Sequence, residues 1–338
     1  MIKVGLIGIG GMGRMHFNCY DRNPNAEVIA ICDVDERKRA GDWSSIGLNV
    51  DTSKSDLVDL SGIKIYSSYE ELIADADVQL VDICLPTPQH AAVAIAALRA
   101  GKDVLCEKPM AMNAGECAAM QDAVRESGRQ LMIGHCLRYW PQYVKAHEII
   151  ASGEYGEVLY ARFHRSGGTP LWSWNNWLTT GSQSGGAVLD MHIHDVDTAL
   201  WWFGRPQQIV ADGLIMDDLP MTVDATWRYE KGPLVFLHGG WDNNSGPFRY
   251  AFKVVMERGT VAHDSATGNP ALQIHSGESS EIAVEEKLAY QNEIDDFIAC
   301  LVEGRPMERV TPETGRLAVE TVQEELRQIQ QKNSEPAP

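Results

Sequence analysis

Two histidines and three aspartates fall within eight consecutive positions of this chain, in the segment DMHIHDVD that begins at Asp190. The apolar residues around them recur at steps of three to five, which is typical of a helix and does not fit the alternation of a strand. We therefore expect one helix over residues 185–204. Residues three or four apart on a helix share a face, so Asp190, His194 and Asp197 are grouped and His192 points elsewhere.

A carboxylate and an imidazole four residues apart on a helix suit proton transfer, because the carboxylate can orient the ring and raise its basicity. Asp190 and His194 are therefore our candidate acid–base pair. Three alternatives stay open: His194 as a hydrogen-bonded core histidine, Asp197 as a residue that only holds a helix or loop, and a metal held by His192, His194 and Asp195. Helical geometry separates those ligands, so we predict no metal.

The glycines near the N-terminus form G-x-G-x-x-G directly after a strand-like segment and before a helical one, and Asp33 lies 33 − 13 = 20 residues beyond the last glycine. In this context the glycines allow a tight turn, close approach of the backbone to a pyrophosphate, and close packing of helix and strand. The sequence therefore predicts a dinucleotide site. The cofactor-binding residues expected in this loop are Gly8, Gly10, Gly11, Met12 and Gly13.

An acidic residue at the end of the second strand selects the cofactor. Asp33 is expected to accept hydrogen bonds from the adenosine ribose hydroxyls and to repel a 2′-phosphate, which favours NAD over NADP. The cations Arg37, Lys38 and Arg39 follow closely and keep NADP open as the alternative, although they equally suit a solvated helical turn. NAD is the predicted cofactor.

Length, charge and cysteine content limit the class of protein. A chain of 338 residues favours two domains, and its 29 Lys and Arg against 47 Asp and Glu give a formal net charge of −18. Such a charge disfavours nucleic acid and membrane surfaces as partners. The seven cysteines include no C-x-x-C, the N-terminus lacks a signal-peptide pattern, and the longest apolar run, AAVAIAAL, is too short to span a bilayer. We therefore expect a cytoplasmic protein.

The order of the expected elements gives the fold class. Strand-like and helical segments alternate up to about residue 133, which predicts an α/β domain with a Rossmann-type, doubly wound parallel sheet. Hairpins such as DATWRYEKGPLVFLHGGW follow, which predict an α+β domain with a large open, mostly antiparallel sheet, and two helices close the chain. We place the NAD(P)-binding domain at 1–133, a substrate-binding and oligomerisation domain at 134–331, and a frayed tail at 332–338.

The segment DICLPTPQHAAVAIAALRAGKDVLCEKPMA resembles the Gfo/Idh/MocA family of sugar and polyol oxidoreductases, in which a strand ending near T-P and H precedes an E-K-P signature. The similarity covers nearly the whole chain. GHCLRYWPQY resembles the opening of the family's second domain, SGGAVLDMHIHDVDTALWWFG resembles its G-G-x-x-x-D-x-x-x-H-x-x-D helix, and TPETGRLAVE resembles its last helix.

This resemblance implies that Lys108, Asp190 and His194 occupy the positions of the family's catalytic Lys, Asp and His, and that a cis bond before Pro109 sets the direction of the lysine. A salt bridge from Lys108 to its neighbour Glu107 is the structural alternative. The family resemblance also implies a homodimer or homotetramer formed through the open sheet. The other cofactor-binding residues that we expect are Pro86, Thr87, His90, Glu107 and Lys108 itself.

One position departs from the family, which more often has a small residue where this chain has His192. The shape of the local pocket, and with it the substrate, is therefore open. A purely structural role is the alternative for both Glu107 and His90.

A carbohydrate platform is expected in the segment LWSWNNWL, because flat rings meet sugar C–H faces and amides bond to hydroxyls. Plain core packing is the alternative for its tryptophans, and Arg162 and His164 on the preceding strand are weaker candidates. The substrate-binding residues that we predict are Lys108, His164, Trp174, Asn176, Trp177, Asp190 and His194.

Oxidation of a secondary alcohol needs a base and a cation near the developing alkoxide, so we expect His194 to accept the proton and Lys108 to polarise the oxygen or relay the proton. This reading makes the chain an NAD(P)-dependent oxidoreductase acting on a sugar, glycoside or inositol-like cyclitol. A glycoside hydrolase assisted by transient NAD-dependent oxidation and a non-catalytic NAD sensor are the alternatives.

Overall fold

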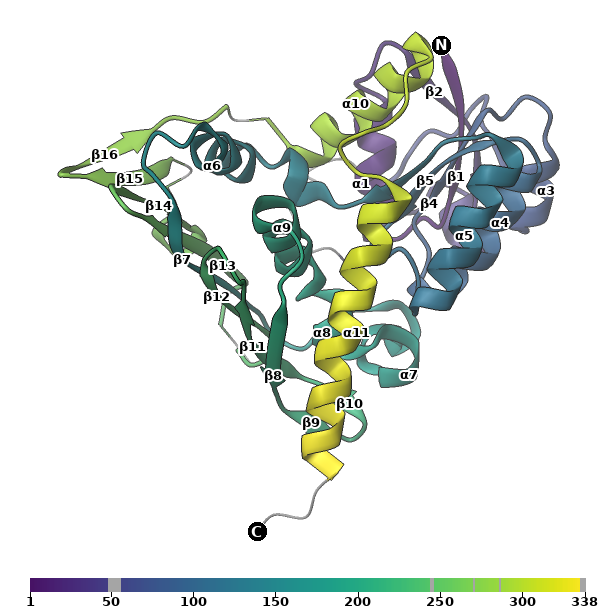
Figure 1. The fold of residues 1–338 in the computed structure, drawn as a ribbon. Coiled ribbons are helices and arrows are strands. Elements are labelled where there is room, and N and C mark those ends of the chain that lie inside the picture. Colours follow the sequence, from purple (N-terminus) through teal and green to yellow (C-terminus); the bar gives the residue numbers. More distant parts are fainter. Residues whose placement is uncertain (48–55, 244–245, 270, 286, 335–338) are drawn as a thin grey trace. The chain divides into compact units, whose positions relative to one another are not determined.

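Apolar strands alternate with helices at the start of the chain and build a sheet of six parallel strands in the order β3-β2-β1-β4-β5-β6 (Figure 1). Most of these strands are rich in Val, Ile and Leu, as expected where helices cover both faces of a sheet. This confirms the predicted Rossmann-type sheet. The strands are β1 Ile2–Ile7, β2 Ala26–Cys32, β3 Lys64–Tyr66, β4 Leu80–Ile83, β5 Asp103–Glu107 and β6 Leu131–Gly134.

The computed structural model describes residues 1–47, 56–243, 246–269, 271–285 and 287–334. The chain divides into two compact units, the first made of Met1–Cys136 with Tyr290–Arg316 and the second of Leu137–Ala289 with Leu317–Pro338. The helices of the first unit are α1 Gly11–Tyr20, α2 Glu36–Arg39, α3 Tyr69–Ala74, the 3-10 turn η1 Thr87–Gln89, α4 His90–Arg99, α5 Ala114–Ser127 and α10 Ala289–Glu303.

The division differs from the two contiguous domains expected from the sequence. Residues 290–316 return to the first unit because α10 packs on α1, where Gln291 Nε2 donates to Cys19 O at 3.1 Å and Asn23 Nδ2 donates to Asp295 Oδ1 at 2.8 Å. A composition change along the chain cannot reveal such a return. The last helix, α11 Pro312–Ser334, belongs to the first unit up to Arg316 and to the second from Leu317.

The second unit contains a sheet of eight strands in the order β16-β15-β14-β13-β7-β12-β11-β8. Only β7 and β12 pair in parallel among these strands, which confirms the predicted, mostly antiparallel sheet. The strands are β7 Val158–Ser166, β8 Gln208–Asp212, β11 Thr222–Arg228, β12 Leu234–Gly240, β13 Arg249–Met256, β14 Gly259–Asp264, β15 Leu272–Ser276 and β16 Glu278–Ile282, beside a small pair, β9 Ile215–Met216 and β10 Leu219–Pro220.

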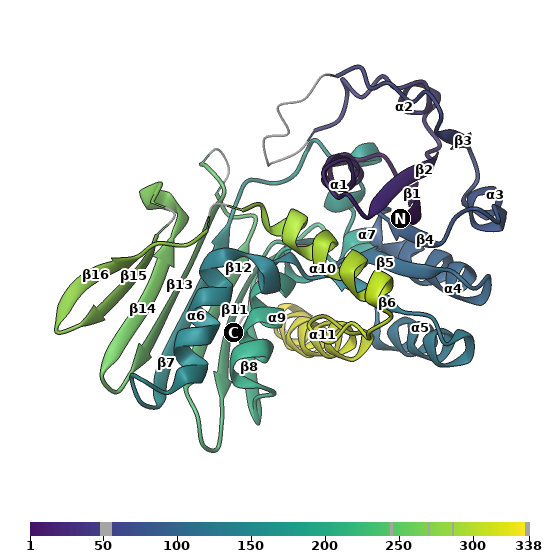
Figure 2. The same ribbon diagram turned by 90° about the horizontal axis from the view of Figure 1, so that it is seen from above.

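Helices cover one face of this sheet, and the described part of the chain places none on the other (Figure 2). Phe163 on β7 meets Trp202 on α9, and Trp227 on β11 donates to Glu325 on α11. The remaining helical segments of the unit are η2 Cys136–Tyr139, α6 Pro141–Ser152, η3 Trp174–Thr179, α7 Gly181–Ser184, α8 Gly186–Asp190, α9 Ile193–Phe203 and η4 Ser265–Thr267.

The single helix expected over residues 185–204 is wrong, because the structure has two helices, α8 and α9, with a turn between them. The carbonyl of Ala187 accepts hydrogen bonds from both Met191 N at 3.0 Å and His192 N at 2.9 Å, so one turn is widened to an i to i+5 bond. The spacing of apolar residues along the sequence does not reveal one extra residue in a helical turn. Asp190 therefore ends α8, and His194 lies in the first turn of α9.

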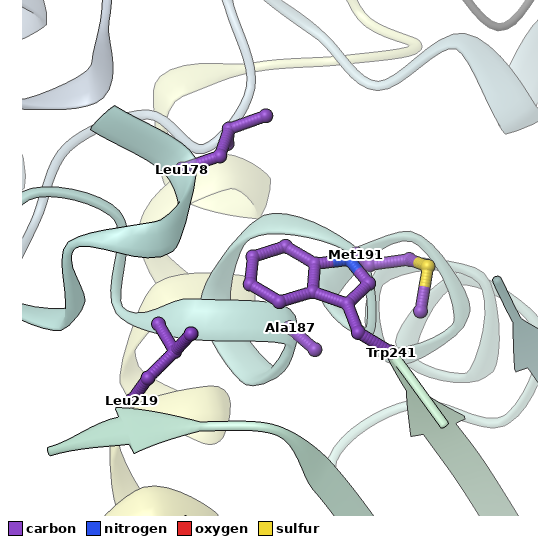
Figure 3. Packing of buried hydrophobic residues seen from close by; sticks show 5 residues of the cluster. All are labelled: Leu178, Ala187, Met191, Leu219 and Trp241. Atoms are coloured by element: carbon purple, nitrogen blue, oxygen red, sulfur yellow. The ribbon is translucent and has the colours of Figure 1, made fainter. Parts of the chain in front are cut away.

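A small apolar cluster holds α8 in place, and Figure 3 shows its members around the ring of Trp241, which follows β12. Trp177 and Met221 pack against the cluster from outside. Since α8 ends at Asp190, this packing supports the position of a candidate catalytic residue. The buried members are Leu178, Ala187, Met191, Leu219 and Trp241.

The C-terminal segment is ordered further than expected, because α11 includes residues 332–334 of the predicted tail. Residues 335–338 lie outside the described part of the chain. Among the described helices, none combines the length and the apolar character needed to cross a membrane.

Candidate active site

The glycine loop between β1 and α1 has the geometry that its pattern predicts. Gly8 has φ +91°, and a Cβ there would lie 2.6 Å from the Cys84 carbonyl oxygen. A Cβ on Gly13 would lie 2.0 Å from Gly8 O, so this glycine allows α1 to pack against the loop. A Cβ on Gly10 would meet nothing within 4 Å, which leaves room beside the N-terminus of α1 for an anion.

Asp33 lies at the end of β2 and bonds to the glycine loop. Its Oδ2 accepts the Ile9 N–H at 2.7 Å and its Oδ1 accepts the Asp35 N–H at 2.8 Å. Each carboxylate oxygen keeps a further lone pair for a ribose hydroxyl. Lys38 Nζ lies 3.8 Å from Asp33 Oδ2, while Arg39 Nη1 donates to the backbone carbonyls of Asp33 and Val34. These residues fit the adenosine end of NAD, and Lys38 is the cation nearest to the carboxylate among the three considered from the sequence.

The E-K-P turn follows β5, and its Lys108–Pro109 peptide bond is cis, as the family resemblance implies. Glu107 Oε2 accepts the backbone N–H of Lys108 at 3.1 Å. The ring nitrogens of His90 lie 2.8 Å from Pro109 O and 2.7 Å from Leu85 O, and burial lowers the pKa of this histidine. His90 therefore ties the turn to the end of β4 through backbone atoms.

The other expected cofactor residues surround the same turn. Thr87 is buried at the start of η1 and Pro86 before it is half-buried, as is Lys108. The contacts of Glu107 and His90 favour positioning of the turn, and their contact with the cofactor stays a prediction.

Sequence reasoning did not identify His16 and Asp82. His16 contacts Glu107, the first residue of the E-K-P turn, and Asp82 contacts His16. His16 on α1 lies between Asp82 on β4 and Glu107, with ring nitrogen to oxygen distances of 2.8 Å and 3.2 Å. A signal was present: Asp82 is a charged residue in the otherwise apolar strand LVDI. A buried acid in such a strand needs a partner.

The second unit carries the other candidate catalytic groups. Asp190 and His194 are half-buried, whereas the residues between and after them are buried. The backbone at Met191 and His192, between the two helices, keeps right-handed helical angles. The two side chains therefore come from adjacent helix ends and not from one helix face.

The neighbouring acidic residues and His192 have structural partners. Arg138 forms two hydrogen bonds of 2.8 Å with the carboxylate of Asp197, which supports the structural alternative for that residue. His192 Nε2 lies 2.9 Å from Glu325 Oε2 on α11, and the ring packs against Gly239, where a Cβ would come within 2.8 Å of the His192 Cβ. The histidine that departs from the family is thus a buried link between helix and sheet.

These contacts also weigh against the metal set of His192, His194 and Asp195. Both oxygens of Asp195 bond to Arg165 at 3.0 Å, and one nitrogen of His192 is held by Glu325. The ligand atoms that the set requires are therefore engaged by other side chains.

The predicted substrate residues Trp174, Asn176 and Trp177 lie together in η3, whereas His164 lies elsewhere. Trp174 is half exposed, and Trp177 packs on the apolar cluster beneath α8, with Asn175 and Asn176 between them in left-handed backbone (φ 49° and 55°). His164 differs: it stacks on His238 on the open face of the sheet, opposite to its neighbour Phe163, which meets α9. Alternation along β7 makes this unavoidable, so we drop His164 from the site.

Comparison with known proteins identifies families for both parts of the chain. Residues 2–135 match the family described as "Oxidoreductase family, NAD-binding Rossmann fold", and residues 143–262 match the "GFO/IDH/MocA C-terminal domain". Similar proteins include an inositol 2-dehydrogenase of Rubrobacter xylanophilus, 34% identical over 60% of this chain and 52% of the relative. An inositol 2-dehydrogenase 2 of Saccharopolyspora erythraea is 30% identical over 71% of this chain and 68% of the relative.

The matched region spans about half the length of several of these relatives, including 52% of the Rubrobacter protein. Solved structures show the same fold over the whole chain. A levoglucosan dehydrogenase in complex with NADH and levoglucosan has a TM-score of 0.83 at 20% identity and covers 98% of each chain. A UDP-N-acetylglucosamine 3-dehydrogenase of Acidithiobacillus ferrooxidans has a TM-score of 0.78 at 22% identity, again over 98% of each chain.

Proposed function

Since the chain belongs to the Gfo/Idh/MocA family of oxidoreductases, we propose that it is an NAD-dependent dehydrogenase of a secondary hydroxyl on a cyclitol, sugar or glycoside. The observation that carries the proposal is the glycine loop with Asp33, joined to the E-K-P turn at the carboxyl ends of the same parallel sheet. Ligands of open α/β sheets bind at that edge. The inositol 2-dehydrogenases among its relatives favour a cyclitol.

The residues of this chain fit the dinucleotide, because Gly10 leaves space for a pyrophosphate and Asp33 offers acceptors to a ribose. NAD bound by these residues would supply the hydride acceptor for oxidation of the alcohol carbon. His194 accepts the hydroxyl proton, and Asp190 orients the ring and stabilises its cation. Lys108 polarises the substrate oxygen and stabilises the developing alkoxide. In the reverse direction the same groups protonate a ketone.

The substrate is proposed to rest on the ring of Trp174 and to reach the side chains of Asn176 and Trp177. Trp174 exposes half of its surface on a short turn whose other tryptophan, Trp177, packs against the apolar cluster, so its ring is accessible to a ligand. Such rings meet the C–H faces of sugars and cyclitols.

Assembly and location follow from the same reading. We propose a homodimer or homotetramer through the open face of the eight-stranded sheet, supported by that bare face, and a cytoplasmic location, supported by seven free cysteines. NADP stays the alternative cofactor through Lys38.

The function is tested by incubating the purified protein with NAD or NADP and with inositols, glucose, other hexoses or simple glucosides. Absorbance of the reduced cofactor that rises in proportion to one of these polyols, and more with NAD, is the expected result. Release of free sugar from a glucoside without net reduction identifies the hydrolase instead. NAD binding without either reaction identifies a sensor.

A further inference from the structure

Three ionisable side chains form a row inside the first unit. His16 and Asp82 are 0% exposed and Glu107 is 6% exposed. His16 Nδ1 lies 2.8 Å from Asp82 Oδ2, which is a direct hydrogen bond. His16 Nε2 lies 3.2 Å from Glu107 Oε1, an ion-pair contact that is less well aligned. The imidazole ring therefore connects β4 to the end of β5.

The charge on this row follows from its burial and its partners. Burial is the largest single influence on the ring and lowers its pKa, but Asp82 and Cys84 together raise the pKa of His16 well above its usual value. Burial likewise opposes the Glu107 carboxylate, yet His16 and Lys108 keep the pKa of Glu107 below its usual value. These shifts favour the charged form of both His16 and Glu107. Removing one member leaves a buried charge without compensation.

Other polar groups surround the row without replacing any member. The Cys84 thiol lies 3.5 Å from His16 Nδ1, and Tyr20 lies one turn along α1. Glu293 on α10 is 0% exposed, and burial together with the Glu107 charge raises its pKa well above the usual value. His16 is therefore the cation that faces both Asp82 and Glu107 from α1.

A metal ion does not explain the row. The side chains of His16, Asp82 and Cys84 do offer ligand atoms within 4.8 Å of one another. However, the nitrogen and the oxygen that a metal would need are already joined to each other at 2.8 Å. Direct hydrogen bonding satisfies them without an ion.

Glu107 transmits the position of His16 to the turn that follows. While its Oε1 faces His16, its Oε2 accepts the backbone N–H of Lys108 at 3.1 Å. Gly134 pairs with Glu107 on β6, and a Cβ there would lie 3.2 Å from the Glu107 carboxyl carbon. A side chain at residue 134 would therefore press against the carboxylate. Its two oxygens thus join the ring of His16 to the peptide of Lys108.

We propose that His16 is a positioning residue: clamped between Asp82 and Glu107, it fixes the Glu107 carboxylate and through it the backbone at Lys108. The proposal extends the proposed function. Its claim about kcat rests on that function, whereas its claim about the Lys108 backbone does not. Misplacement of a reacting group by about 1 Å can lower a rate about 100-fold, so a residue that does not touch substrate can control kcat.

The first test measures backbone order at Lys108 and needs no substrate. Hydrogen exchange of the Lys108 amide is compared in the NAD-loaded wild type, H16L, H16Q and K102M, well below each melting temperature. Lys102 is the matched control, since its buried Nζ donates to Asp75 O and Val78 O at the opposite end of β5. We expect exchange about tenfold faster in H16L, a smaller rise in H16Q, and no change in K102M.

The second test separates binding from turnover. In H16L we expect kcat to fall about 100-fold while the Kd for NAD stays within about threefold, and the loss should not add to that of E107Q in the double variant. Unchanged exchange in both His16 variants overturns the proposal, as does faster exchange with wild-type kcat. Should H16L not fold, H16Q carries both tests. A wild type without turnover defeats the proposed function instead, and the exchange result still decides the role of His16.

Discussion

Lys108 carries the largest share of the proposed chemistry, and its backbone is held from both sides. Glu107 accepts its N–H, and His90 bonds to the carbonyl of Pro109 after it. These contacts fix the peptide from which the Lys108 side chain extends. A residue placed in this way contributes to the transition state and little to the binding of the dinucleotide.

Replacing Lys108 by Met should therefore lower kcat about 10²–10⁴-fold, the usual contribution of a positioned proton-transfer group, and leave the Kd for NAD nearly unchanged. Steady-state kinetics and fluorescence titration with NAD measure the two quantities. Lys64→Met, at an exposed lysine paired with Asp75 and Asp77, is the control with wild-type kcat. Loss of NAD binding in the Lys108 variant would show a structural role instead.

At the scale of the element, the sheet of the second unit contains an ionic bridge between strands. His238 on β12 lies 2.9 Å from Asp224 on β11 through Nδ1 and 3.0 Å from Asp242 through Nε2. The hydrogen bond to Asp224 raises the pKa of His238, and the same bond lowers the pKa of Asp224. The bridge is complete only when the ring is protonated and the carboxylates are ionised.

The sign of the pH effect follows. An Asp carboxylate in this bridge stabilises the fold above its unfolded pKa of about 3.9. His238 adds its full stabilisation below its unfolded pKa of about 6.5, and this stabilisation is lost as the pH rises through its raised folded pKa. His238→Gln should therefore lower the melting temperature by about 1–3 °C at pH 5.5 and by less at pH 9. Burial lowers the pKa of the stacked His164, so His164→Gln should show the opposite trend. Equal differences at both pH values would contradict the assignment.

At the scale of the whole molecule, the chain passes between its two units three times, after Cys136, Ala289 and Arg316. Lys108 belongs to the first unit, and Asp190 and His194 belong to the second. The groups of the proposed mechanism are therefore distributed over both units.

The open sheet face gives a test of the proposed assembly. Val210 on β8 is 47% exposed and pairs with Thr226 on β11. The next residue on β11, Trp227, is buried against the helices, so Val210 and Thr226 face the open side of the sheet. Val210→Glu should reduce the molar mass measured by light scattering toward that of a monomer, because it places a charge in the proposed interface. Val302→Glu, at a valine 51% exposed on α10, is the matched control and should leave the mass unchanged. A monomeric wild type at micromolar concentration is the contrary result.

Local patterns determined much of this protein. The parallel sheet, the glycine loop with Asp33 and the hairpins of the second unit follow from period, turn residues and spacing, which act over a few residues. Asp190 and His194 were predicted from their spacing as well as from the family motifs, and Lys108 from the E-K-P motif alone.

Tertiary structure decided the rest, because the deciding contacts join residues distant along the chain. Only the fold brings His16 to Asp82 and Glu107, His192 to Glu325, and residues 290–316 back to the first unit. The widened turn at Ala187 and the outward direction of His164 likewise depend on packing and strand alternation in the folded chain. Buried charges need partners wherever the fold supplies them, and a linear pattern does not say where that will be.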